Sequence, residues 1–383
     1  MFKFLYWLVT FIVCGALGVT AWGGHVEPQV MRALPSLASM LLPITAVVAV
    51  LWGAVMLITW RWKAALFTAV IIALCWSAIR TVIPIHPIAH MQVSRKAHVD
   101  SRNSDNSGDR LLRVVTLNVM NWGWYDGTQR QPNPNMLYIL DEQADIVVLV
   151  EAAIVKDFME LPSMDSLREQ INALYPYRST RKNRSDGDIM LLSRYPIAEV
   201  DCDLTTLTDN AIKRHRHNIG RAWDVNVEGD TIRVIGVHLQ SFGLTDDDKD
   251  AIDRSIAERQ RPSMSDSHSM IGKLRSAVTK HASEAQDIAR VVNASGENVI
   301  VAGDFNDTPC SYAYHLLRDT GLDDAWADAG LGYRATFNRN HLLFKIDHIL
   351  YRGRLQAVRS DVTRRGESDH YPLAATLRLS SKQ

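Results

Sequence analysis

Six short apolar runs in this sequence are each bordered or interrupted by a residue that can carry a charge or a strong hydrogen bond. The runs are rich in Val and Ile, which favours buried β-strands. Charged side chains are rarely tolerated beside buried strands unless they are paired or bound to a metal. Six such cases are hard to attribute to scattered turn residues. The polar residues concerned are Asn118, Glu151, His238, Asp304 with Asn306, Asp347 with His348, and Asp369 with His370.

The clearest of these runs is Val299–Pro309, with the sequence VIVAGDFNDTP. Its apolar start, closed by Gly303, is typical of a strand that is buried on both faces. Asp304 and Asn306 stand two residues apart, so in extended backbone they project to the same side. A carboxylate can orient a water or accept its proton, and an amide can donate to a phosphoryl oxygen. Taken alone, the motif is equally compatible with a turn after a strand.

The part of the chain that follows residue 110 alternates short apolar runs with polar turns and contains few helical stretches. This pattern favours two packed sheets with helices outside them over a doubly wound parallel sheet. One long amphipathic helix is expected over Ser263–Ala294. The predicted strands are Leu111–Val119, Ile146–Val150, Ile189–Ser193, Ala222–Val227, Thr231–Val237, Val299–Ala302, Ile346–Tyr351 and Leu373–Leu379.

Three apolar segments, Phe4–Trp22, Leu37–Trp60 and Ala64–Ile83, are each about long enough to cross ~30 Å of hydrocarbon. The first alone could be a signal peptide, but the next two favour three transmembrane helices. A soluble helical bundle is the alternative, although its helices would show a charged face. We therefore expect a membrane anchor over residues 1–88. Residues 89–110, rich in Ser, Asn, Asp and Gly, are expected to form a flexible tether.

The orientation of this anchor depends on few charges. Arg61 and Lys63 crowd the short second loop, and short basic loops prefer the cytoplasm. With three spans, the rest of the chain would then be extracytoplasmic. Arg80, Arg95 and Lys96 lie just past the third span and reduce the charge difference between the two sides. The sequence favours a multi-pass membrane protein whose part after the third span is extracytoplasmic.

The overall charge argues against a protein that coats nucleic acid through a global field. Lys plus Arg and Asp plus Glu both number 42, so only a local basic rim remains compatible with a nucleic-acid substrate. The four cysteines show no paired spacing, and neither a zinc site nor a disulfide framework is indicated. The sequence leaves open whether Cys202 pairs with Cys310, and it leaves the oligomeric state open.

Six motifs, in chain order, resemble those of the endonuclease/exonuclease/phosphatase superfamily of metal-dependent phosphoesterases, which includes deoxyribonuclease-type nucleases, neutral sphingomyelinases and inositol polyphosphate phosphatases. The resemblance covers about Leu111–Leu379, and the apolar segments with GDFNDTPCSYAYH further resemble a bacterial membrane-anchored branch. It implies a four-layered α/β sandwich of two mainly antiparallel sheets with outer helices, a catalytic domain over 111–383, and motifs that meet at one end. The motifs are TLNVMNW, DIVVLVEA, GVHLQS, GDFNDTP, KIDHIL and SDHYPL.

The resemblance also implies the role of each acidic or amide residue. Glu151 would be the main ligand of a Mg²⁺ ion, with Asn118 and Asp369 nearby; Mn²⁺ is a possible substitute. Asp304 would orient or deprotonate the attacking water. Asn306 would bind a phosphoryl oxygen.

The two histidines and one arginine receive phosphate-binding roles in the same way. His370 would contact the scissile phosphate, with Asp347 fixing its tautomer. His238 would be a second donor to the transition state or the acid for the leaving oxygen. Arg221, at the end of the basic stretch 213–221, occupies a position where deoxyribonuclease-like relatives can carry a phosphate-contacting arginine. Solvated loops are the alternative for that stretch and for the basic stretch 178–184. Structural or turn roles are expected for His348, Asn121 and Asp307.

These inferences predict a membrane-anchored, divalent-metal-dependent hydrolase of phosphate esters. The reaction would be in-line attack of water on phosphorus, with phosphodiesters preferred. A phosphodiesterase or nuclease is the leading prediction, with nucleic acid or a lipid headgroup as the candidate substrate, and a lipid-headgroup or inositol-phosphate phosphoesterase is the alternative. A catalytically inactive, membrane-tethered binding domain is the alternative of another class, and the intact set of candidate residues argues against it.

Overall fold

The computed structural model of the chain describes residues 2–86, 109–123, 133–152, 162–179, 188–207, 216–243, 264–339, 342–366 and 368–381. The predicted tether lies outside these residues, apart from Asp109 and Arg110. Most of the basic stretch 178–184 and the start of the stretch 213–221 also lie outside them. The flexibility of the tether therefore stays a prediction.

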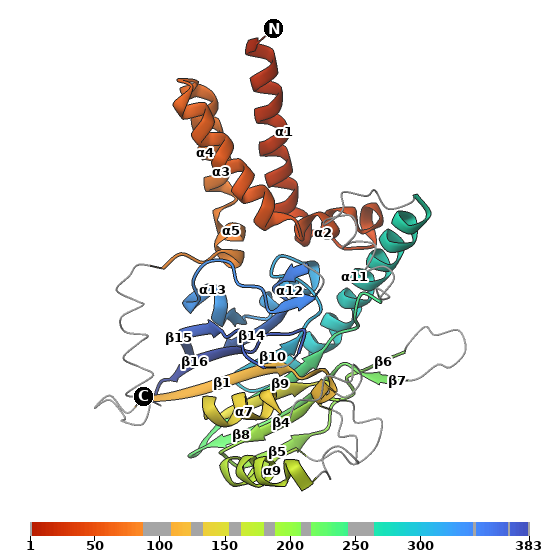
Figure 1. Cartoon of the computed structure of the whole chain (residues 1–383), viewed down its shortest axis with the longest axis vertical. Coiled ribbons are helices and arrows are strands. Elements are labelled where there is room, and N and C mark those ends of the chain that lie inside the picture. The colour runs from red at the N-terminus through yellow and green to blue at the C-terminus, as the bar shows by residue number, and fades with distance from the viewer. Residues whose placement is uncertain are drawn as a thin grey trace.

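Two mixed sheets of six strands form the centre of the described part, and helices surround them (Figure 1). Each sheet has one parallel pair, β1 with β2 and β10 with β9, and its other pairs are antiparallel. The predicted α/β sandwich with mainly antiparallel pairing is confirmed. The first sheet has the order β15 (Leu355–Val362), β16 (Leu373–Leu379), β1 (Arg110–Asn118), β2 (Ile146–Val150), β4 (Met190–Ser193), β3 (Tyr177–Arg178). The second has the order β11 (Asp323–Asp324), β14 (Asp347–Arg352), β10 (Val299–Asp304), β9 (Asp230–His238), β8 (Gly220–Val227), β5 (Ile197–Val200).

All eight predicted strands coincide with observed strands. Within the two large sheets, β3, β5, β11 and β15 were not predicted. In β15 the register shifts between Ala357 and Arg359, so the strand lacks a regular alternation of apolar and polar residues. Two small hairpins were also missed. They are β6 (Thr205–Leu207) with β7 (Arg216–Asn218), and β12 (Phe337–Arg339) with β13 (Leu342–Phe344).

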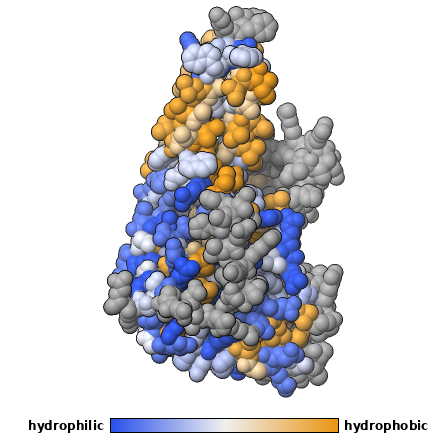
Figure 2. Space-filling model, turned by 90° about the vertical axis from the view of Figure 1, so that its left-hand side faces the viewer, coloured by the Kyte–Doolittle hydropathy of each residue, from blue (hydrophilic) through white to orange (hydrophobic). Residues whose placement is uncertain are grey.

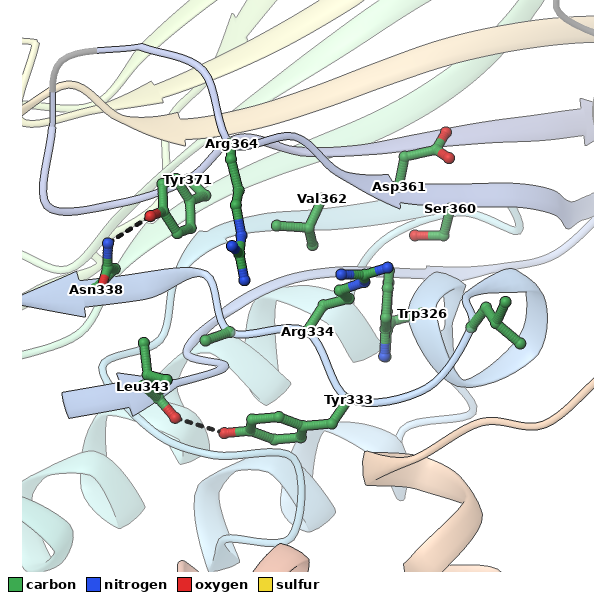
Figure 3. A pocket seen from close by; sticks show the side chains of 12 residues that line it. Trp326, Tyr333, Arg334, Asn338, Leu343, Ser360, Asp361, Val362, Arg364 and Tyr371 are labelled. Carbon is green, nitrogen blue, oxygen red and sulfur yellow. Dashed lines mark hydrogen bonds between the residues drawn. The ribbon is translucent and has the colours of Figure 1, made fainter. Parts of the chain in front are cut away.

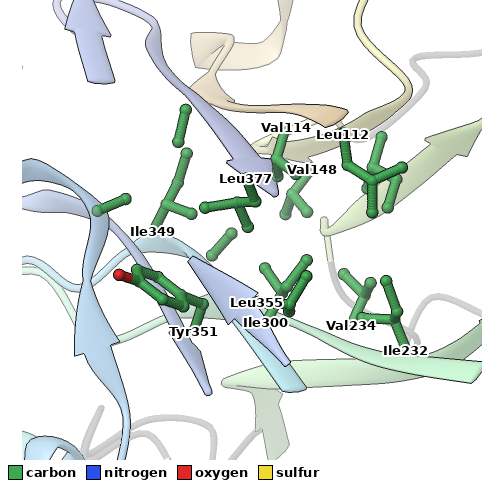
Figure 4. Packing of buried hydrophobic residues seen from close by; sticks show 14 of the residues in the cluster. Leu112, Val114, Val148, Ile232, Val234, Ile300, Ile349, Tyr351, Leu355 and Leu377 are labelled. Carbon is green, nitrogen blue, oxygen red and sulfur yellow. The ribbon is translucent and has the colours of Figure 1, made fainter. Parts of the chain in front are cut away.

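Aliphatic side chains from the inner faces of both sheets fill the space between them (Figure 4). Their burial removes a large apolar area from water, at roughly 25 cal/mol for each Å². Because every core strand is anchored by this packing, the ends of the strands are held in fixed relative positions. The packed residues include Leu112, Val114, Val148 and Leu377 from the first sheet, and Ile232, Val234, Ile300 and Ile349 from the second.

Separate apolar clusters attach the outer helices to the two sheets. The first sheet is covered by α7 (Pro134–Glu142) and α9 (Pro162–Leu174). The second is covered by α11 (Met264–Asn293) and α12 (Tyr312–Arg318), and α11 matches the predicted long helix. The short α13 (Ala325–Ala329) contacts β14 and β15.

The amino-terminal segments are helical but only one is a continuous candidate span. Phe4–His25, which covers all but the first two residues of α1 (Phe2–Trp22), is long and apolar enough to cross a membrane. The predicted second span is divided into α2 (Leu34–Ser39) and α3 (Leu42–Ile58), with a bend of 62°. The predicted third span is divided into α4 (Trp62–Leu74) and α5 (Trp76–Val82), with a bend of 65°. Three continuous transmembrane helices are therefore not confirmed, and three spans result only if each bent pair counts as one.

The turn after α1 packs directly on the loop that follows β10. A Cβ atom at Gly24 would overlap the backbone carbonyl of Cys310, so this close approach requires glycine. The neighbouring His25 ring stacks on His315 of α12, with ring centroids 3.9 Å apart. Cys310 is buried in this contact and is a free thiol, as is Cys202, so the two do not form a disulfide.

The His25–His315 contact predicts a loss of stability in acid. Burial, together with the charges of His25 and Arg318, lowers the pKa of His315 to about 4. The unfolded chain protonates this residue near its ordinary pKa of about 6.5, so the free energy of unfolding falls as the pH drops from 6.5 toward 4. The contribution lost at pH 5 is about 2 kcal/mol. In His315→Gln we expect a correspondingly smaller difference in unfolding free energy between pH 7 and pH 5, measured by denaturation in detergent. An equal difference in both proteins would show that His315 does not titrate as described.

Candidate active site

The polar residues that border the predicted strands lie together at one edge of the two sheets. In the second sheet, Asp304 is the register partner of His238 on β9 and of Asp347 on β14. In the first sheet, the parallel pairing of β1 with β2 places Asn118 next to Glu151, which directly follows β2. A hydrogen bond joins the polar residues of the two sheets, because Asn118 Nδ2 lies 3.1 Å from Asp304 Oδ2. The strand ends therefore meet, as the resemblance implies.

Asn118 is buried and donates to two carboxylates. Its Nδ2 lies 3.0 Å from Glu151 Oε1 as well as 3.1 Å from Asp304 Oδ2, and its Oδ1 accepts from the backbone N–H of Met120 at 3.0 Å. Glu151 has a φ of +52°, which non-glycine residues rarely adopt. This backbone conformation aims a carboxylate into a cavity from the end of a fully buried strand. Strain of this kind is typical of a functional position.

Asp304, Asp347 and His370 form a buried cluster beside this amide. His370 Nδ1 lies 2.8 Å from Asp347 Oδ2, and His370 Nε2 lies 3.6 Å from Asp304 Oδ2. Burial alone would lower the pKa of His370, but the charges of the two carboxylates raise it to about 10. Burial raises the pKa of Asp304 to about 6, with His370 opposing and Asp347 reinforcing this shift. Phe337 packs its ring against the His370 ring, with centroids 5.2 Å apart.

His238 has a partner that the sequence analysis missed. His238 Nδ1 lies 3.1 Å from Asp188 Oδ2, and Nε2 lies 3.8 Å from Glu151 Oε1. Burial alone would lower the pKa of His238, but the hydrogen bond and charge of Asp188 raise it to about 9. Asp188 borders the predicted strand Ile189–Ser193, just as the other polar residues border theirs. That position is the signal that could have identified it.

The other predicted site residues differ in how closely they approach this cluster. Asn306 lines the cavity, has a φ of +46° and uses one amide N–H to bond the carbonyl of Leu239 at 2.9 Å. Asp369 also lines the cavity, and its Oδ2 lies 3.7 Å from Arg339. Arg221 is buried elsewhere, where it pairs with Glu199 and donates to the carbonyl of Ile189. It does not line this cavity, so its contact with phosphate stays a prediction.

Two residues for which structural roles were expected support the loop after β10. His348 is buried, and its Nε2 lies 3.1 Å from the carbonyl of Asp307. The Asp307 carboxylate lies 3.2 Å from Nδ1 of the buried His281 on α11. His281 Nε2 in turn lies 2.5 Å from the carbonyl of Gln240. These hydrogen bonds hold two loops in place, namely the loop after β10 that carries Asn306 and the loop after β9 that follows His238.

The site opens into a cavity of about 510 Å³. The hairpin of β12 and β13 separates it from another cavity of about 680 Å³ (Figure 3). Phe337, Arg339 and Phe344 line the first cavity, whereas Asn338 and Leu343, which alternate with them, line the second. The polar residues of the first cavity are mainly those predicted from the strand ends, namely Glu151, Asp304, Asn306, Asp369 and His370.

The residues at this site fit a divalent cation. Asp304, Asp347 and His370 offer ligand atoms within 4.8 Å of one another. The buried Asp347 Oδ1 has no hydrogen-bond partner among the described residues, which is an expensive arrangement unless a cation or ligand is bound. Carboxylate oxygens are the ligands that Mg²⁺ and Mn²⁺ prefer. The ligand set predicted from the sequence, Glu151 with Asn118 and Asp369, borders the same cavity, and its assignment stays a prediction.

Comparison with known proteins gives a family for this fold and site. The chain matches the Endonuclease/Exonuclease/phosphatase family over residues 103–370, so it belongs to that family. Similar solved structures include a sphingomyelinase C from Streptomyces griseocarneus, with 19% identity over 70% of this chain and 99% of that chain and a TM-score of 0.44. Another is a family protein from Leptotrichia buccalis, with 18% identity over 69% of this chain and 98% of that chain and a TM-score of 0.45. No curated protein sequence matches this chain. Members of the family are divalent-metal-dependent hydrolases of phosphate esters.

The amide of Asn118 provides a test of the site geometry. In Asn118→Leu, the carboxylates of Glu151 and Asp304 lose their shared donor while the volume is nearly kept. We expect the metal-free variant to lose about 1–3 kcal/mol of unfolding free energy. Denaturation in detergent with a chelator measures this, and Asn293→Leu at an exposed position is the control. Equal unfolding free energies of the two variants would contradict the hydrogen bonds from Asn118 to the carboxylates of Glu151 and Asp304.

Proposed function

We propose that this protein is a membrane-anchored, divalent-metal-dependent phosphodiesterase. The observation that carries the proposal is the buried cluster of Asp304, Asp347 and His370, which faces Glu151 across one cavity in a domain of a phosphoesterase family. A binding domain without activity would have no physical need to bury this many ionisable groups, because each must be desolvated.

Glu151, with Asn118 and Asp369, would hold the ion beside the cluster of Asp304 and Asp347. When bound, the ion would neutralise charge on the phosphate and make phosphorus more electrophilic.

The remaining groups have protonation states that suit hydrolysis. Asp304, whose pKa burial raises to about 6, is close to the range in which a carboxylate accepts a proton from water at neutral pH. His370 is held as an imidazolium by Asp347 and would donate its Nε2–H to a phosphoryl oxygen. His238, charged through Asp188, would donate to the phosphate or to the leaving oxygen. Asn306 keeps one amide N–H for a phosphoryl oxygen, because an amide nitrogen carries two.

These donors would oppose the charge that builds on phosphorus oxygens as water attacks in line. Preorganised donors in a buried site act more strongly than they would in water. The bond formed joins the water oxygen to phosphorus, the bond broken joins phosphorus to the leaving oxygen, and the proton taken by Asp304 balances the one given to the leaving group. His238 or His370 would supply that second proton.

The amino-terminal helices would provide the membrane attachment. Apolar side chains gather on these helices, and hydrophilic residues predominate on the visible domain surface below them (Figure 2). Arg61 lies over the Tyr6 ring at 4.0 Å, so the loop between α3 and α4 lies near the start of α1. This end of the helices carries basic residues and lies far from the catalytic domain in Figure 1. Basic residues favour a cytoplasmic location, so this end of the helices would lie in the cytoplasm. With each bent pair as one span, the catalytic domain would be extracytoplasmic.

Hydrolysis of a phosphodiester by the full chain in detergent tests the function. We expect activity with Mg²⁺ or Mn²⁺, its loss on chelation, and its recovery when the ion is returned. Glu151→Gln and His370→Gln should each lower kcat by about 100-fold or more, because one removes an ion ligand and the other a donor to phosphate. Glu297→Gln, at an exposed glutamate, is the control and should leave kcat unchanged. Full activity of both site variants would refute the proposal.

A further inference from the structure

The active-site cavity has walls of two chemical kinds. Its polar residues come mainly from the strand ends, whereas apolar residues from other elements line much of the rest. Phe242 follows β9, and Phe337 and Phe344 belong to the β12–β13 hairpin. The long helix α11 contributes Met270 and Leu274, and the amino-terminal segment contributes Leu37, Met40 and Leu41.

The amino-terminal part of this wall belongs to the segment expected to attach the chain to a membrane. Leu37 lies in α2, and Met40 and Leu41 join α2 to the apolar helix α3. The wall of the cavity therefore continues directly into a helix that is apolar throughout its length. In Figure 1, α2 lies beside the far end of α11, and the two helices are in contact.

Several contacts fix α2 beside the site. A Cβ atom at Gly23 would overlap the backbone carbonyl of Pro35, so the turn after α1 packs tightly on α2. The Ser36 hydroxyl donates to the carbonyl of Val26 at 3.0 Å. Gly24 packs against Cys310, just after the loop that carries Asn306. The position of α2 is thus tied to the same loop that forms the polar wall.

Exposed apolar side chains extend this wall to the surface. Leu41 lines the cavity and yet is 52% exposed, and Ile271, next to Met270 on α11, is 41% exposed. Leaving such side chains in water is unfavourable by roughly 25 cal/mol for each Å². A partner with an apolar part would remove this penalty.

We propose that α2 is part of the substrate site, and that Leu37, Met40 and Leu41 bind the hydrocarbon portion of an amphiphilic phosphodiester whose phosphate reaches the strand-end residues. This inference rests on the proposed phosphodiesterase function and specifies its substrate as a membrane lipid with a phosphodiester headgroup. The ligand would enter from the bilayer side, along the junction of α2 and α3.

The charges at the cavity disfavour a nucleic acid as the substrate. A polyanion is held by several Lys and Arg side chains along its backbone. Among the described residues that line this cavity, Arg339 is the one Lys or Arg side chain, and it lies 3.7 Å from Asp369, while the positive charge of His370 is already balanced by Asp347 and Asp304. A single phosphodiester with an apolar tail requires less positive charge and uses the apolar wall.

Two leucines on the same segment provide a matched test. Leu41 and Leu34 are both 52% exposed, but only Leu41 lines the cavity. The full chain in mixed micelles would be assayed on long-chain and short-chain phosphodiester lipids that share one headgroup, with several headgroups in turn. We expect the wild type to prefer the long chain, and Leu41→Ser to lower this preference in kcat/KM roughly tenfold. Leu34→Ser should keep the preference within about twofold of the wild type. Leu37→Ser provides a second cavity variant if Leu41→Ser does not fold.

Each other outcome has a definite meaning. No chain-length preference in the wild type, equal losses in Leu41→Ser and Leu34→Ser, or a higher kcat/KM on DNA or RNA than on any lipid would overturn the inference while leaving the phosphodiesterase function intact. Failure to cleave any of these diesters, including the short-chain and nucleic-acid substrates, would overturn both.

Discussion

The buried hydrogen bond between Asp347 and His370 is the interaction on which the site depends. Asp347 stands at the start of β14 and is the register partner of Asp304 at the end of β10, so strand pairing alone brings two desolvated carboxylates together. Like charges this close are unfavourable unless a positive group compensates them. His370 supplies that charge at 2.8 Å from Asp347, and Asn118 supplies a neutral donor to Asp304 from the other sheet. The two sheets are thus joined at their ends by polar contacts and along their length by the apolar core.

The amino-terminal helices change how this site is understood. In a free catalytic domain the cavity would lack the wall that α2 contributes. Here the close approach at Gly24 and the stacked rings of His25 and His315 attach the amino-terminal helices to the loop beside the site. Attachment to a membrane and construction of the substrate pocket would then be two consequences of one packing arrangement. This coupling would explain why apolar residues of the amino-terminal segment lie next to the carboxylates of the candidate site.

The sequence predicted the strands well because they depend on local patterns, and the polar residues that border them could be picked out for the same reason. Buried Val and Ile runs, such as 146–150 and 299–302, predict strands wherever they pack, and a charged residue beside such a run predicts a site. Three features depend on tertiary contacts and could not be found this way. Asp188 becomes important only because β4 brings it to His238. The bends between α2 and α3 and between α4 and α5 interrupt segments that are mainly apolar on both sides of the break, so hydropathy alone gives no signal of them. The ion pair of Arg221 with Glu199 joins residues from neighbouring strands of the second sheet.

The structure of the full chain in a lipid nanodisc, with Mg²⁺ and a non-hydrolysable phosphonate analogue of a long-chain phosphodiester lipid, would test the central claim most directly. The account predicts that the phosphonate lies against His370 with an ion at Glu151, and that the hydrocarbon chain contacts Leu37 and Leu41 of an anchor still docked on the domain. A ligand whose chain avoids α2, or an anchor separated from the loop after β10, would contradict it.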